Sequence, residues 1–125
     1  AAARLDQGAA VIAFRRKVVQ AVRRLAPDLP CGWLCGASLP GTPAEQVAWI
    51  AAEAEKCGTD LVDLRYTMLS PEIIAGLHRR GLTVWTWTVN DPAVMAALLR
   101  WGVDGITTDR VAAALAVRRG LVAPR

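Results

Sequence analysis

The chain of 125 residues fits one domain, and its composition, 54% hydrophobic and 21% charged, excludes a disordered protein. No apolar run approaches the roughly 18 residues of a membrane span, so we expect no such span. The formal net charge is +4, but the basic residues are spread over expected helix surfaces without interleaved aromatic residues. This pattern predicts no nucleic-acid partner.

The chain has three cysteines, Cys31, Cys35 and Cys57, and their spacing does not make a zinc-binding pattern. The first ten residues lack the apolar segment of a signal peptide. An odd number of cysteines without a signal peptide favours reduced thiols and a cytoplasmic location. We therefore expect three buried, structural cysteines.

Apolar runs and helical periods alternate along the whole chain. The expected strands are Ala9–Phe14, Cys31–Leu34, Leu61–Tyr66, Leu82–Val89 and Asp104–Asp109. The expected helices are Arg16–Ala26, Pro43–Lys56, Pro71–Arg80, Pro92–Trp101 and Val111–Arg119. Residues 1–10 are interpreted as a lead-in, residues 11–120 as one domain and residues 121–125 as a tail.

Signals for helix ends support these boundaries. Thr42 and Ser70 precede prolines as expected N-caps, and Asp91 does the same before Pro92. Gly102 is expected to end the fourth helix in a left-handed conformation. The third strand alternates, which predicts Leu61, Asp63 and Arg65 on one face of the sheet.

A strand, a helix and a second strand joined by short loops predict parallel strands with right-handed crossovers. The chain is therefore expected to be an α/β protein with about five parallel strands. A closed eight-stranded barrel typically needs ~250 residues, about twice this length. In such folds the polar residues at the C-terminal ends of the strands carry the chemistry.

Two segments, WTVND (Trp87–Asp91) and GVDGITTDR (Gly102–Arg110), resemble the closing part of the glycerophosphodiester phosphodiesterase family. The similarity extends back through VVQAVRRLAPDLPCGWL and through the SPE, helix and H-x-x-G-L-x-V stretch, so it covers about Val11–Arg119. It implies the C-terminal half of a TIM-type (β/α) barrel. The chain departs from the family pattern at Ala13-Phe14, where the family often has Ser-Phe.

The resemblance implies metal-dependent hydrolysis of a glycerophosphodiester, in lipid metabolism, to glycerol 3-phosphate and an alcohol, with Ca²⁺ or Mg²⁺ as the cation. The family's His-Arg-Gly, Pro-Glu-Asn and Glu-x-Asp motifs and its second catalytic histidine do not occur in this sequence. We therefore assign no catalytic residue and no metal ligand, and we expect the chain alone to be inactive. Whether the chain is itself an enzyme is left open.

Three residues are candidates for a wall of the substrate pocket. Trp87 is placed like the family tryptophan at the pocket wall, and the alternative is a core aromatic, as for Trp85. Asn90 could contact a phosphate or hydroxyl group, and it also suits a turn between strand and helix. Asp109 ends its strand on the catalytic face and is the best acidic candidate, although capping of the last helix is the favoured interpretation.

The remaining candidates are interpreted structurally. His78, the one histidine, lies at a helix C-terminus at the opposite end of the strands, where the helix dipole favours it. Asp104 precedes its strand on that same side. No pair of carboxylates has a spacing that specifies a divalent site.

A second hypothesis is a non-enzymatic assembly module. Five strands without closure leave two unpaired sheet edges, which natural proteins rarely leave bare. Pairing with a second copy or with a separate N-terminal half would cover them.

Overall fold

The computed structural model describes residues 10–122. Its strands are β1 (Val11–Ala13), β2 (Cys31–Cys35), β3 (Leu61–Arg65), β4 (Thr83–Trp87) and β5 (Gly105–Ile106). Its helices are α1 (Arg16–Leu25), α2 (Pro43–Cys57), α3 (Pro71–Arg79), α4 (Pro92–Arg100) and α5 (Val111–Val122), with a short 3-10 helix η1 (Tyr66–Met68) after β3.

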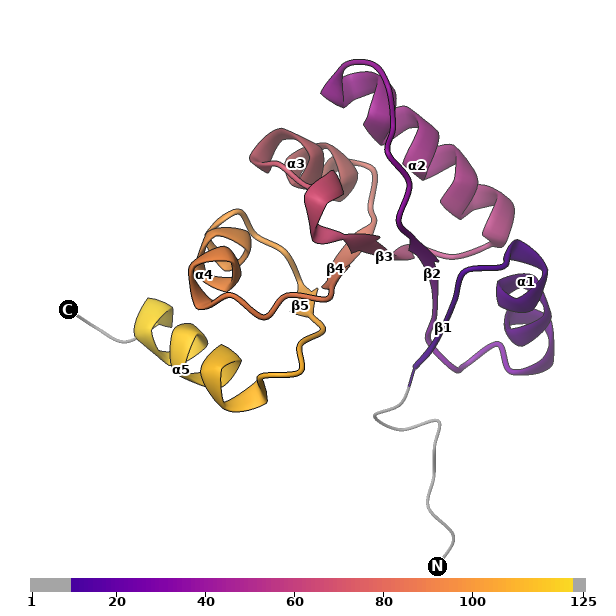
Figure 1. The fold of residues 1–125 in the computed structure, drawn as a ribbon. Helices are drawn as coiled ribbons and strands as arrows, with labels where there is room; N and C mark the ends of the chain where they lie inside the picture. Colours follow the sequence, from indigo (N-terminus) through magenta and orange to yellow (C-terminus); the bar gives the residue numbers. More distant parts are fainter. Residues whose placement is uncertain (1–9, 123–125) are drawn as a thin grey trace, which may run out of the picture.

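The five strands form one parallel sheet in the order β1-β2-β3-β4-β5. Figure 1 shows the helices following one another along the outer side of the strands, from α1 at one end to α5 at the other. The predicted α/β class and half-barrel architecture are confirmed. Within the described residues, β1 and β5 each pair with a single neighbour, so both edges of the sheet are open.

Side chains along each strand alternate between two faces of the sheet, and only one of these faces packs beneath the helices. Val62 and Leu64 of β3 and Val84 of β4 are fully buried in the core beneath the helices. Leu61, Asp63 and Arg65 lie on the other, inner face, in register with alternate residues of β4. Figure 1 shows no helix over that inner face.

The expected helix caps are present. The Thr42 hydroxyl accepts a hydrogen bond from the Glu45 N–H at 3.2 Å, and the Ser70 hydroxyl accepts one from the Ile73 N–H at 3.2 Å. The Asp91 carboxylate accepts one from the Ala93 N–H at 2.9 Å. These bonds satisfy amide groups that a helix N-terminus otherwise leaves unpaired.

Several predicted boundaries were wrong at strand and helix ends. The strand expected over Asp104–Asp109 is reduced to Gly105–Ile106, because Thr108 and Asp109 bond instead to a neighbouring loop. The last helix runs through Val122 rather than ending at Arg119. Most of the expected lead-in, residues 1–9, and the last three residues of the expected tail lie outside the described residues.

The three cysteines are buried free thiols, as expected. Burial raises the pKa of each thiol, which keeps it in the neutral form. None of the helices in the described part combines the length and the apolar character needed to cross a bilayer.

Gly102 has a φ of 94°, in the left-handed region, as predicted. A Cβ at this position would meet only the His78 ring at 3.9 Å, so a side chain there has room and only its backbone is strained. Gly102→Ala is therefore expected to lower the free energy of unfolding by about 1 kcal/mol or more. Chemical denaturation followed by circular dichroism measures this change.

Gly120→Ala is the matched control. Gly120 lies within α5 without a positive φ, and a Cβ there meets open space. Alanine is expected to stabilise that helix by up to about 1 kcal/mol. Equal effects at the two positions would contradict the left-handed cap at Gly102.

Candidate functional site

The C-terminal ends of β4 and β5 are held together by Asn90. Its side-chain oxygen accepts hydrogen bonds from the Thr108 hydroxyl and from the Asp109 N–H, both at 3.0 Å. Its side-chain nitrogen donates a hydrogen bond to the Asp109 carboxylate at 3.3 Å, and its backbone carbonyl accepts one from the Arg110 guanidinium at 3.1 Å. Asn90 thus fixes the loop after β5 against the loop after β4.

The structure therefore brings two of the three sequence candidates, Asn90 and Asp109, into direct contact. The favoured capping role for Asp109 is not seen, because among residues 10–122 its carboxylate accepts a hydrogen bond from the Asn90 side chain and none from an amide of α5. The Asp109 carboxylate lies beside Asn90 and is exposed.

Trp87 belongs to a second cluster at the C-terminal ends of the strands. Its indole N–H donates to the Asp63 carbonyl at 3.1 Å, which fixes the ring across β3. The ring of Phe14 meets it edge-on, with centroids 6.0 Å apart and planes at 89°. The Arg65 guanidinium lies over the Trp87 ring, 5.1 Å from its centroid. Trp87 is half-buried on the inner face, outside the core beneath the helices.

Asp63 is a buried carboxyl on the inner face. Its residue is 1% exposed, and within residues 10–122 its Oδ1 atom has no hydrogen-bond partner. Burial raises the pKa of Asp63 to about 6. The alternation predicted its face correctly, but a polar position in an alternating strand normally faces water. Here its neighbours across the sheet are Leu34 and Trp85, and Asp63 is buried away from water on the inner face.

His78 lies at the N-terminal ends of the strands, as expected. Its Nε2 atom is 2.8 Å from Oδ2 of Asp104, and the same oxygen accepts a hydrogen bond from the Val84 N–H at 2.8 Å. This pair joins α3 to the N-terminal ends of β4 and β5. The only histidine is thus separated from the C-terminal strand ends that carry Trp87 and Asn90.

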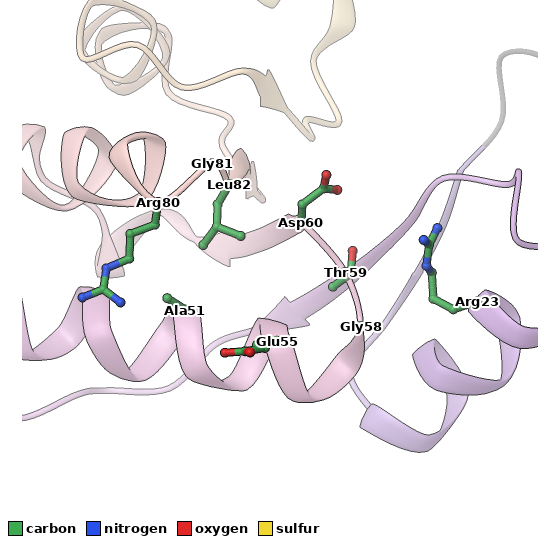
Figure 2. Close-up of a pocket in the computed structure, with 9 residues that line it drawn as sticks. All are labelled: Arg23, Ala51, Glu55, Gly58, Thr59, Asp60, Arg80, Gly81 and Leu82. Carbon is green, nitrogen blue, oxygen red and sulfur yellow. The ribbon is translucent and has the colours of Figure 1, made fainter.

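A cavity of about 680 Å³ also lies at the N-terminal edge. It is lined by the residues that lead into β3 and β4, including Asp60 and Gly81. Figure 2 shows Arg23 and Arg80 at its two ends, where they do not converge on a common point. Its position places this cavity away from the strand ends that carry chemistry in barrel enzymes.

The described residues do not fit a divalent cation. Among them, no group of three His, Cys, Asp or Glu side chains lies close enough to hold a metal ion. Asp91 caps a helix, Asp104 pairs with His78 and Asp109 contacts Asn90. Asp63 lies on the inner face and belongs to no such group of three side chains among residues 10–122. A cation would therefore need ligands from outside this part of the chain.

Sequence reasoning did not select Arg65, Phe14 or Asp63 as site residues. Arg65 was placed on the right face, and its two-residue spacing from Asp63 was the available signal. Its stacking on Trp87 depends on the register between β3 and β4, which pairs these two residues directly. No local pattern in the sequence specifies that register.

Comparisons with known proteins identify the family of this chain. The model of the glycerophosphoryl diester phosphodiesterase family matches residues 3–113. The chain belongs to this family.

Relatives extend the match to individual proteins. The YhdW protein of Bacillus subtilis is 29% identical over 99 residues, which are 79% of this chain and 39% of that protein. The glycerophosphodiester phosphodiesterase of Caldanaerobacter subterraneus is 27% identical over 101 residues, 79% of this chain and 37% of that enzyme.

Solved structures of the family share the fold. A glycerophosphodiester phosphodiesterase from Parabacteroides distasonis superposes with a TM-score of 0.71 at 25% identity, over 94% of this chain and 46% of that one. The chain thus spans less than half the length of the relatives that it matches. Its five strands correspond to one part of a barrel in these proteins.

The buried Asp63 predicts an unusual dependence of stability on pH. The folded chain holds the Asp63 proton more tightly than the unfolded chain, because its folded pKa is raised to about 6. Its stabilising contribution is complete below the unfolded pKa and is lost as the pH rises through about 6. We expect wild type to lose on the order of 2 kcal/mol relative to Asp63→Asn between about pH 4 and pH 7.

Denaturation of both proteins across this pH range measures the difference. Other titrating groups, such as Glu53 with its pKa lowered by Lys56 and Arg16, contribute equally to both curves and cancel. Parallel curves for wild type and Asp63→Asn would show that Asp63 titrates normally.

Proposed function

We propose that this chain forms the substrate-binding wall of a glycerophosphodiester phosphodiesterase, whose remaining wall carries the catalytic groups. The observation that carries the proposal is the position of Trp87, Asn90 and Asp109. All three follow or end strands at the C-terminal edge of a half-barrel, where barrel enzymes bind their substrates. Family membership supports the same substrate class and a role in lipid metabolism.

The reaction proposed is hydrolysis of the phosphodiester, in which water adds to phosphorus and the alcohol leaves, giving glycerol 3-phosphate. The leaving alkoxide needs a proton, and the developing charge on the phosphate oxygens needs stabilisation. His78 is at the wrong edge to donate the proton. The described residues instead shape and close the pocket: Trp87 offers an apolar wall, and Asn90 holds the loops that carry Asp109.

We further propose that the divalent cation, Mg²⁺ or Ca²⁺, is held by the complementary wall. The support is the poor fit of the described carboxylates to any metal ion. When bound, such a cation supplies charge stabilisation at phosphate oxygens. The complementary wall is proposed to be an N-terminal half-barrel, either on the same polypeptide or on a separate chain.

A reducing, cytoplasmic setting is proposed on the basis of the cysteines. All three are free thiols in the structure, and their burial keeps them neutral. Disulfides are common in oxidising compartments and rare in the cytosol.

The first test is catalysis by the chain alone. With glycerophosphocholine and either Mg²⁺ or Ca²⁺, the pure 125-residue chain is expected to release no glycerol 3-phosphate above the rate without protein. A coupled glycerol 3-phosphate assay measures this. Robust turnover would mean that catalytic groups are present in this chain and would overturn the division of labour between two walls.

The second test restores the missing wall. The N-terminal half of the Caldanaerobacter enzyme, joined ahead of this chain, is expected to give metal-dependent release of glycerol 3-phosphate. In that fusion Trp87→Ala is expected to lower kcat/KM by about tenfold or more, a loss of ~1.4 kcal/mol. Trp49→Ala is the control, because Trp49 lies on the outer helix α2 against Trp33.

A non-enzymatic assembly module remains the second candidate, and the two open sheet edges favour it. Size-exclusion chromatography with light scattering is then expected to show a dimer of the isolated chain. Ile12→Lys places a charge on the inner face of the edge strand β1 and is expected to shift the dimer toward monomer. A folded, strictly monomeric wild-type chain would rule out self-association as the way these edges are covered.

A further inference from the structure

Arg65 lies where the inner face meets the C-terminal edge of the sheet. It is the last residue of β3 and pairs in register with Trp87, the last residue of β4. Its guanidinium lies over the Trp87 indole, 5.1 Å from the ring centroid. A guanidinium held against an aromatic face keeps its N–H groups available for a ligand.

The surroundings fix this arrangement in advance. Trp87 cannot turn freely, because its N–H is bonded to the Asp63 carbonyl at 3.1 Å and Phe14 packs against its ring. Gly36 leaves the space that the guanidinium occupies. A Cβ at Gly36 would lie 2.8 Å from an Arg65 nitrogen and 3.0 Å from the Trp87 ring. Glycine at this position therefore permits the stack.

The Arg65 charge is not neutralised by the residues around it. Across residues 10–122 the Arg65 guanidinium forms neither a hydrogen bond nor an ion pair, whereas Arg16 binds Glu53 at 2.7 Å. Asp63 lies two residues earlier on the same face, but its Oδ1 atom has no partner. Burial raises the pKa of Asp63, which favours the neutral form of this carboxyl.

We propose that Arg65, stacked on Trp87, binds oxygens of a phosphoryl group at the mouth of the half-barrel. Arginine presents parallel N–H donors that match two oxygens of a phosphate. This inference rests on the proposed function, since it assigns to Arg65 the phosphoryl group of a glycerophosphodiester. It adds a cationic contact from this wall, while the other catalytic groups come from the complementary one.

The test measures binding by the 125-residue chain itself. Isothermal titration with sn-glycerol 3-phosphate, inorganic phosphate and glycerol separates the anion from its carrier. We expect both phosphate compounds to bind and glycerol not to bind. Arg65→Gln is expected to weaken the binding of both by about tenfold or more, the size typical of a lost charge-assisted hydrogen bond. Arg65→Lys is expected to bind these compounds with an affinity between those of wild type and Arg65→Gln.

Arg80→Gln is the matched control. It removes the same charge from the opposite edge of the sheet, beside the cavity in Figure 2, and is expected to leave binding unchanged. Circular dichroism verifies that each variant is folded. Absence of phosphate binding by wild type, or equal losses in Arg65→Gln and Arg80→Gln, would overturn the assignment.

The fusion with the Caldanaerobacter half separates this inference from the proposed function. If the fusion hydrolyses substrate and Arg65→Gln raises its KM, both stand. If it hydrolyses substrate with unchanged KM and kcat in Arg65→Gln, the assignment of Arg65 fails and the proposed function holds. If the fusion is inactive while binding by the isolated chain depends on Arg65, the phosphoryl site stands and the proposed function fails.

Discussion

The parallel hydrogen-bonded ladder from β2 through β3 to β4 is the constraint on which the rest of the structure depends. It fixes the register that places Asp63 beside Trp85 and Arg65 beside Trp87. The same register sends Val62, Leu64 and Val84 into the core beneath the helices. Packing under the helices accounts for the stability of one face, so the opposite face can carry polar groups. Function is expected on that second face because the first is filled.

The inner face is organised at the strand ends by two kinds of contact. Asn90 ties the loop after β4 to the loop after β5 through hydrogen bonds to Thr108 and Asp109. Trp87 ties β4 to β3 through the Asp63 carbonyl and carries Arg65 on its ring. Both contacts use backbone groups as well as side chains, which positions the loops and strand ends rigidly. Such preorganisation lowers the entropic cost of binding a ligand, because fewer groups have to be ordered.

The open edges of the sheet and the Asp63 carboxyl on its inner face are the two features that the proposed complementary wall would complete. Within the described residues, β1 and β5 lack a second neighbour, and Asp63 Oδ1 lacks a partner. Closing the barrel would pair the edges and bring a second wall opposite Asp63. The proposed complementary half-barrel accounts for both features, and family membership with a match to less than half of each relative supports that proposal.

The sequence by itself determined the order of strands and helices, the caps at Thr42, Ser70 and Asp91, the left-handed Gly102 and the family. These depend on residues close together in the chain, through hydrophobic period, capping chemistry and local motifs. Only the tertiary structure decided that the Asp109 carboxylate contacts Asn90, that Asp63 is buried with no partner for its Oδ1 atom among residues 10–122, and that Arg65 stacks on Trp87. Each of these depends on strand register and on groups distant in sequence, which local propensity does not encode.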